Sequence, residues 1–199
     1  MPTSKTSSSL VSGKSSTALL LIDVINDLDF PEGPQFLRQA LPAARHIAAL
    51  KRRAKRAGVP AIYVNDNFGR WQSDFLAQVK HAQHEKSRGR DIAKLLAPEE
   101  DDYFVLKPRH SGFFSTTLDI LLNDLGTKTL ILTGFAGDIC VLYTANDAYM
   151  RDYEIIVASD GIASNTKQGS ITALKQMKNN LRARVCTAAR VPLGKTPQR

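Results

Sequence analysis

Short apolar runs alternate with longer amphipathic stretches along most of the chain. Residues 18–22 form an uninterrupted apolar run that ends in Asp23, a pattern typical of a parallel strand covered on both faces. The same reasoning predicts further strands at 59–64, 103–106, 129–132, 154–158 and 184–187.

Helices are predicted between these strands, at 41–57, 118–125, 139–151 and 166–180. Pro42 suits the first helical position, and Gly58 and Gly126 suit the left-handed position just past a helix end. Ser115 or Thr116 can cap the second helix. Residues 68–98 are more polar and less periodic, which leaves two interpretations open, a lid or a poorly predicted helical segment.

This alternation predicts an α/β fold with three layers, a Rossmann-like parallel sheet of six strands with helices on both faces. A length of 199 residues fits one domain, which we expect at 17–190. Residues 1–16 are rich in Ser and Lys without an apolar core, so they predict a disordered leader rather than a secretory signal. Residues 191–199 are predicted to be a C-terminal tail.

The amino-acid composition and charge indicate a globular protein and exclude several other classes. With 43% hydrophobic and 23% charged residues it is typical of a globular domain, and no apolar run approaches the roughly 20 residues of a membrane span. The net charge of +8 raises the possibility of nucleic-acid binding, but the densest basic cluster, 51–56, falls on the last turns of a predicted helix, where cations complement the helix dipole. We therefore expect neither a membrane nor a nucleic-acid partner. Two cysteines favour a reducing compartment, and the cytoplasm is the expected location.

Three chemically capable residues fall at strand ends. Asp23 follows the first strand, Lys107 the third, and Cys140 follows the fourth across a turn that contains Gly134 and Gly137. Ligands of open parallel sheets bind at the carboxyl ends of the strands, so these side chains are expected to meet. The start of a helix favours a thiolate at Cys140, Asp23 can accept the thiol proton, and Lys107 can stabilise the thiolate.

Three segments together resemble the isochorismatase-like cysteine hydrolases: LLID at 20–23, KPRHSGF at 107–113 and TGFAGDICV at 133–141. The resemblance extends from about Thr17 to Thr187. It implies the strand order 3-2-1-4-5-6 and a catalytic triad of Asp23, Lys107 and Cys140. It also implies a cis peptide between Phe135 and Ala136, and an oxyanion hole formed by the backbone N–H groups of Ala136 and Cys140.

The reaction implied by this resemblance is hydrolysis of an amide-type C–N bond of a small molecule through a thioester. Family members that hydrolyse nicotinamide carry a metal site of an aspartate and nearby histidines after the second strand. Here Asp66 has no histidine close behind it, and a set of Asp66, His81 and His84 is too uneven to favour a metal, so no metal or cofactor is predicted. Members that cleave isochorismate lack the nucleophilic cysteine, so Cys140 argues against that vinyl-ether reaction.

The substrate pocket is predicted to be lined by Leu28, Asn67, Trp71 and Phe135. Arg109 or Arg70 is a candidate to bind a substrate carboxylate, Cys186 is expected in the core, and His110 is expected to end the loop after Lys107. The resemblance implies a homodimer or homotetramer. Two alternatives stay open, a non-catalytic small-molecule-binding protein on the same fold and a vinyl-ether hydrolase of the isochorismatase type.

Overall fold

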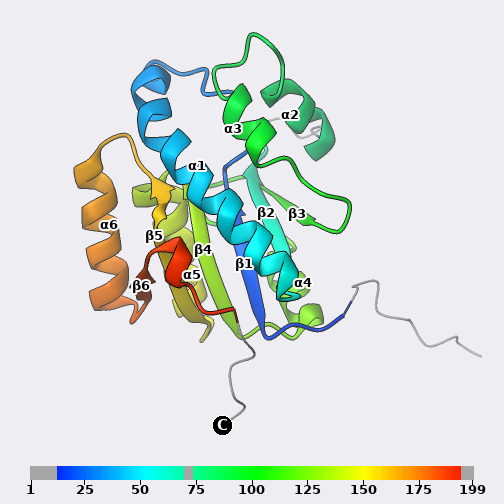
Figure 1. Cartoon of the computed structure of the whole chain (residues 1–199). Coiled ribbons are helices and arrows are strands. Elements are labelled where there is room, and N and C mark those ends of the chain that lie inside the picture. The colour runs from blue at the N-terminus through cyan, green and yellow to red at the C-terminus, as the bar shows by residue number, and fades with distance from the viewer. Residues whose placement is uncertain (1–12, 70–73, 194–199) are drawn as a thin grey trace, which may run out of the picture.

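A computed structural model describes residues 13–69 and 74–193. Six parallel strands form one sheet in the order β3-β2-β1-β4-β5-β6 (Figure 1). The strands are β1 (Thr17–Ile22), β2 (Ala61–Asp66), β3 (Tyr103–Lys107), β4 (Thr129–Phe135), β5 (Glu154–Ala163) and β6 (Arg184–Cys186). The predicted fold class and strand order are confirmed.

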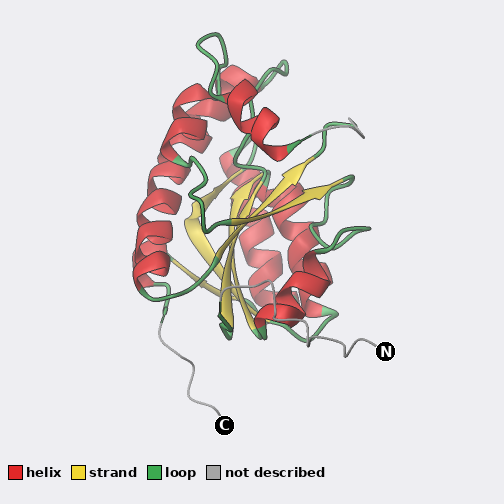
Figure 2. Ribbon diagram, turned by 90° about the vertical axis from the view of Figure 1, so that its right-hand side faces the viewer, coloured by secondary structure: helices red, strands yellow, loops and turns green. Residues whose placement is uncertain are grey.

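Helices cover both faces of the sheet, as the edge-on view shows (Figure 2). They are α1 (Gly33–Arg56), α2 (Phe75–Ala82), α3 (Arg90–Leu95), α4 (Leu118–Leu125), α5 (Leu142–Tyr149) and α6 (Lys167–Asn180), with a π-helical turn η1 (Gly137–Val141) and a 3₁₀ turn η2 (Ala188–Arg190). Because side chains alternate along a strand, Leu19 and Leu21 of β1 pack in the layer of α1, α2 and α3, whereas Leu20 and Ile22 pack in the layer of α4, α5 and α6. The central strand is therefore buried on both faces.

The start of the first helix and the cap of α4 differ from the prediction. The first helix begins at Gly33 with a proline in its first turn, and Pro42 lies inside it. The turns before Pro42 bury Phe36 and Ala40, and this contact with the core outweighs the helix-breaking tendency of the proline. The cap of α4 is Thr117, while the Thr116 hydroxyl donates to the carbonyl of Gly112 and accepts the amide of Leu118.

The segment of uncertain character at 68–98 contains α2 and α3. Phe75 of α2 contacts the rings of Tyr63 on β2 and Phe104 on β3. The helical interpretation of this segment is therefore correct for the described residues. At the other side of the sheet, β5 runs five residues further than predicted, across a register shift opposite Leu132 and Gly134.

The packed region extends slightly beyond the predicted domain limits. The amide of Ser15 donates to the carbonyl of Leu125, and the carbonyl of Ser16 accepts two backbone amides at the start of β4. At the other end, Val191 is buried and its carbonyl accepts a hydrogen bond from Arg53. The rest of the predicted leader and tail, 1–12 and 194–199, lies outside the described residues. Within the described residues, no helix is long and apolar enough to cross a membrane.

The basic cluster at 51–56 lies in the last turns of α1 and contacts neighbouring loops. Lys51 is buried and pairs with Asp102 at 2.5 Å, Lys55 pairs with Asp101 at 2.8 Å, and Arg53 donates to two carbonyls near η2. These contacts fix the helix to neighbouring loops, and the charges of Lys51, Arg53 and Lys55 are paired or hydrogen-bonded within the protein.

Gly134 determines how closely β4 approaches β1. Its φ is +120°, and a Cβ at this position would lie 2.0 Å from the carbonyl oxygen of Ile22, the last residue of β1. Only glycine fits there, because other residues are strained at this φ and would push away the strand that carries Asp23.

We expect Gly134→Ala to destabilise the fold by at least about 2 kcal/mol through backbone strain and this clash. Chemical denaturation of both proteins measures the change. Gly58→Ala is the matched control, since Gly58 also has a positive φ but has open space around its Cα. An equal loss in the two variants would show that the contact with Ile22 contributes nothing.

Candidate active site

Asp23, Lys107 and Cys140 meet at the carboxyl edge of the sheet. Asp23 follows β1 with a φ of +52°, Lys107 ends β3, and Cys140 lies in the π-helical turn η1 after β4. The Lys107 ammonium nitrogen lies 2.9 Å from an Asp23 carboxylate oxygen and 3.7 Å from the Cys140 sulfur, and the thiol is hydrogen-bonded to Asp23. The structure thus brings together the three residues predicted as a triad.

The Lys107 side chain is completely buried, although it carries a charge. Strand β2 lies between β3 and β1, so the lysine must reach across β2 to contact Asp23. Asp66, the last residue of β2, lies on this path, with a carboxylate oxygen 3.4 Å from the ammonium. The sequence analysis considered Asp66 only as a possible metal ligand and missed this contact.

Burial and charge shift the pKa of each group in the cluster. Burial raises the pKa of Asp23, and Lys107 opposes part of this rise. Burial alone would lower the pKa of Lys107, but the negative groups around it, Asp23 first, outweigh burial and raise it. Burial and the Asp23 carboxylate raise the pKa of the Cys140 thiol to about 12, against the attraction of Lys107.

This rise is opposite to the lowered pKa that the sequence predicts for Cys140, and it favours a thiol over a thiolate. Burial of the sulfur beside a carboxylate is the physical reason, and the Lys107 ammonium offsets only part of it. The raised pKa of Asp23 makes this carboxylate a stronger base toward the thiol proton.

Hydrogen bonds hold the residues around Asp23. The amide of Asp66 donates to Asp23 Oδ1 at 2.8 Å. The buried side chain of Asn65 accepts from the amide of Ile25 at 3.2 Å and donates to its carbonyl at 2.7 Å. Sequence reasoning assigned no role to Asn65, and its available signal was a polar residue at the end of an apolar strand.

A buried hydroxyl joins the loop after Lys107 to the turn that carries Cys140. Thr144 Oγ1 donates to the carbonyl of Cys140 at 2.7 Å and accepts the amide of Gly112 at 3.0 Å. Ser111 in the same loop donates to Asp147 of α5 at 2.5 Å. These bonds fix Cys140 relative to Lys107.

The backbone before Cys140 differs from the expectation in one respect. The structure has no cis peptide bond among its described residues, so the bond between Phe135 and Ala136 is trans and the cis prediction is wrong for this structure. The positive φ of Gly134 supplies the sharp change of direction instead. The Ala136 carbonyl accepts the amides of Ile139 and Val141 at 3.1 and 3.2 Å, which opens the π-helical turn. The N–H groups of Ala136 and Cys140 stay the predicted oxyanion donors.

The residues predicted to line the substrate pocket do not all lie in one place. Leu28 and Phe135 are buried in the hydrophobic core on the α1 side, where Phe135 contacts the ring of Phe36. Asn67 is buried, and its amide donates to the Lys107 carbonyl at 3.0 Å, so it lies next to the triad. Trp71 and Arg70 lie outside the described residues.

Arg109, His110 and Cys186 take no part in the hydrogen bonds described around Asp23, Lys107 and Cys140. Arg109 is exposed, and His110 is exposed beside the ring of Tyr143. Cys186 packs partly buried against the core, as expected.

Comparison with known proteins defines the family. Residues 17–190 match the model of the isochorismatase domain. The chain belongs to the isochorismatase family. It is 42% identical over 180 residues to the isochorismatase family protein YaaI of Bacillus subtilis, which covers 89% of this chain and 97% of the relative. The ureidoacrylate amidohydrolase RutB of Methylorubrum extorquens is 42% identical over 85 residues, 43% of this chain and 33% of the relative.

Solved structures of family members share the fold. An isochorismatase-like hydrolase from Alkaliphilus metalliredigens superposes with a TM-score of 0.72 at 28% identity, over 88% of this chain and 97% of that chain. The N-carbamoylsarcosine amidase of Thermoplasma acidophilum superposes with a TM-score of 0.67 at 26% identity, over 89% and 99% of the two chains. The protein is thus an isochorismatase-family hydrolase, and one of these relatives is named an amidohydrolase and another an amidase.

The possible metal ligands of this hydrolase have other partners. His81 Nε2 lies 2.9 Å from Asp27, Asp66 faces Lys107, and His84 accepts the amide of Lys86. Among residues 13–69 and 74–193, no three or more His, Cys, Asp or Glu side chains are grouped so that they could hold a metal ion.

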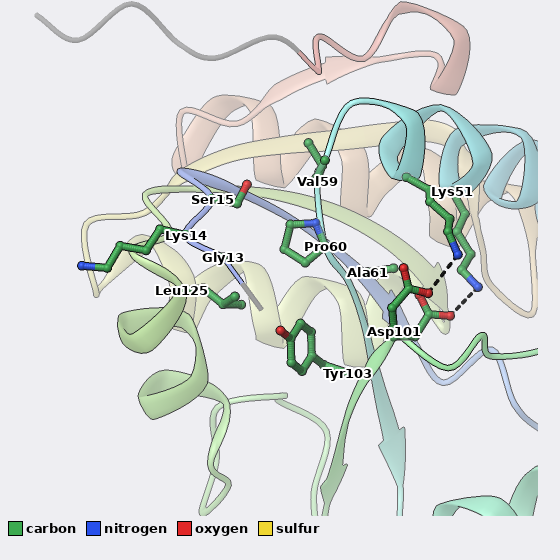
Figure 3. A pocket seen from close by; sticks show the side chains of 13 residues that line it. Gly13, Lys14, Ser15, Lys51, Val59, Pro60, Ala61, Asp101, Tyr103 and Leu125 are labelled. Atoms are coloured by element: carbon green, nitrogen blue, oxygen red, sulfur yellow. Dashed lines mark hydrogen bonds and ion pairs between the residues drawn. The ribbon is translucent and has the colours of Figure 1, made fainter. Parts of the chain in front are cut away.

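A pocket at the opposite edge of the sheet is separate from this chemistry. Figure 3 shows it at the amino ends of β2 and β3, between Pro60, Tyr103 and Leu125. Four of its charged side chains form ion pairs, Lys51 with Asp102 and Lys55 with Asp101. It therefore contributes nothing to the triad.

Replacing Asp23 is expected to have opposite effects on thiol acidity and on turnover. Asp23→Asn removes the charge that raises the pKa of Cys140, so iodoacetamide should alkylate Cys140 about tenfold faster at pH 8, while hydrolysis is lost with the base. Peptide mass spectrometry measures the alkylation rate, with Cys186 as the internal reference. Slower alkylation in the variant would contradict the assigned electrostatics.

Proposed function

We propose that this isochorismatase-family hydrolase cleaves an amide-type C–N bond of a small molecule through a thioester on Cys140. The observation that carries the proposal is the contact of thiol, carboxylate and buried ammonium at the carboxyl edge of the sheet. Nucleophile, base and electrostatic partner are the three elements that such an acyl transfer needs. The amidohydrolase names of RutB and of the N-carbamoylsarcosine amidase support the same class of bond.

The first half of the reaction forms the thioester. The Cys140 sulfur attacks the substrate carbonyl carbon while its proton passes to Asp23, and a C–S bond forms. The backbone N–H groups of Ala136 and Cys140 donate to the oxyanion, and the nearby Lys107 charge favours its formation. The C–N bond then breaks, and the leaving nitrogen takes the proton from Asp23.

The second half releases the acid. Water attacks the thioester carbon and gives a proton to Asp23, the C–S bond breaks, and the sulfur regains the proton as a thiol. Because the thiol is neutral before each cycle, proton transfer to Asp23 accompanies the attack and does not precede it.

The test is a panel of small primary amides, carbamates and ureas offered to the purified protein. We expect at least one to be hydrolysed, with turnover reduced at least about a thousandfold in Cys140→Ala. Mass spectrometry of the intact protein should detect an acyl adduct on Cys140 during turnover.

Cys186→Ser is the matched control, because it alters the other cysteine in β6 and should leave turnover unchanged. Full activity of Cys140→Ala would refute the nucleophile. A folded wild-type protein that binds members of the panel and hydrolyses none would favour the non-catalytic alternative.

A further inference from the structure

The contacts of the Lys107 ammonium account for all of its hydrogen-bond donors. An ammonium has three N–H groups, and the nitrogen has three partners: Asp23 at 2.9 Å, Asp66 at 3.4 Å and the Cys140 sulfur at 3.7 Å. Two carboxylates thus direct two of the donors, and the third points at the nucleophile. With one carboxylate alone, the ammonium could rotate about the terminal Cε–Nζ bond and lose its contact with the Cys140 sulfur.

Asp66 is built into this position. It is the register partner of Lys107 on the neighbouring strand, so the two side chains emerge on the same face of the sheet. Its other carboxylate oxygen accepts the amide of Phe68 at 2.6 Å, which fixes the carboxylate in a tight turn. Its backbone amide also donates to Asp23, so Asp66 contacts both the base and the ammonium.

Asp23 and Asp66 differ in their solvent exposure, and this difference indicates different roles. The Asp23 side chain is 10% exposed and hydrogen-bonded to the thiol, whereas the Asp66 side chain is 32% exposed and contacts the ammonium. When Asp23 receives the thiol proton, it becomes neutral and Lys107 loses its closest counter-charge. Among the described residues, Asp66 is then the carboxylate that still pairs with the buried ammonium, and it keeps the lysine protonated while the sulfur attacks.

We propose that Asp66 is a positioning residue of this site: its carboxylate directs the Lys107 ammonium toward Cys140 and keeps its proton on nitrogen while Asp23 acts as the base. The inference rests on the proposed function and adds a fourth functional residue to it. The charged groups that act on the Cys140 sulfur are then Asp23, Lys107 and Asp66.

The deciding measurement is the rate at which iodoacetamide alkylates Cys140 at pH 8 in Asp66→Asn, followed by peptide mass spectrometry. Without the Asp66 carboxylate the ammonium can turn away from the sulfur and no longer stabilise the thiolate, so alkylation should be at least about threefold slower, whereas a role limited to the charge of Asp66 would make it faster. Asp119→Asn, the same change on α4 away from the cluster, should leave the rate unchanged. Asp66→Ser serves as a second variant, because its hydroxyl can still accept the Phe68 amide without carrying a charge.

Turnover gives the second readout. On the amide found in the panel, Asp66→Asn should lower kcat at least about tenfold and change KM less than about threefold, since Lys107 loses its direction and the substrate loses no direct contact. Alkylation as fast as in the wild type or faster in both folded Asp66 variants would overturn the inference. If no amide is hydrolysed, or if Cys140→Ala stays active, the proposed function fails, while the alkylation rates still decide the role of Asp66.

Discussion

The site depends on one buried positive charge. A lysine side chain without solvent exposure is costly to desolvate, and Lys107 is retained because two carboxylates and a thiol satisfy it. Each partner belongs to a different strand end, so the charge can be satisfied only when β1, β2, β3 and β4 are in register. The chemistry and the folding of this edge of the sheet are thereby coupled through the same contacts.

The architecture supplies that register by close packing. Strand β1 lies at the centre of the sheet with both faces buried, and Gly134 lets β4 approach its last residue at a distance that no side chain permits. The π-helical turn then places Cys140 over the end of β1, and Thr144 ties its carbonyl to the loop after β3. A rigid apolar scaffold thus presents a small polar cluster, the arrangement that precise positioning requires.

The electrostatics of the cluster favour a base-assisted mechanism. A preformed thiolate needs positive charge in excess around the sulfur, and here one ammonium faces two carboxylates. The raised pKa of Cys140 favours the thiol, which is less reactive toward electrophiles than a thiolate. In the mechanism that we propose, Asp23 is the acid and base of both half-reactions and Lys107 is a fixed charge.

The sequence by itself determined the alternation of strands and helices, the capping glycines Gly58 and Gly126, and the residues at the strand ends, because hydrophobic period and turn chemistry are local properties. Its motifs also indicated the family and the triad. Only the tertiary structure decided that Asp66 faces Lys107 and that the Cys140 pKa is raised. Burial and Coulomb interactions depend on distances between segments at least 33 residues apart, and no local pattern encodes them.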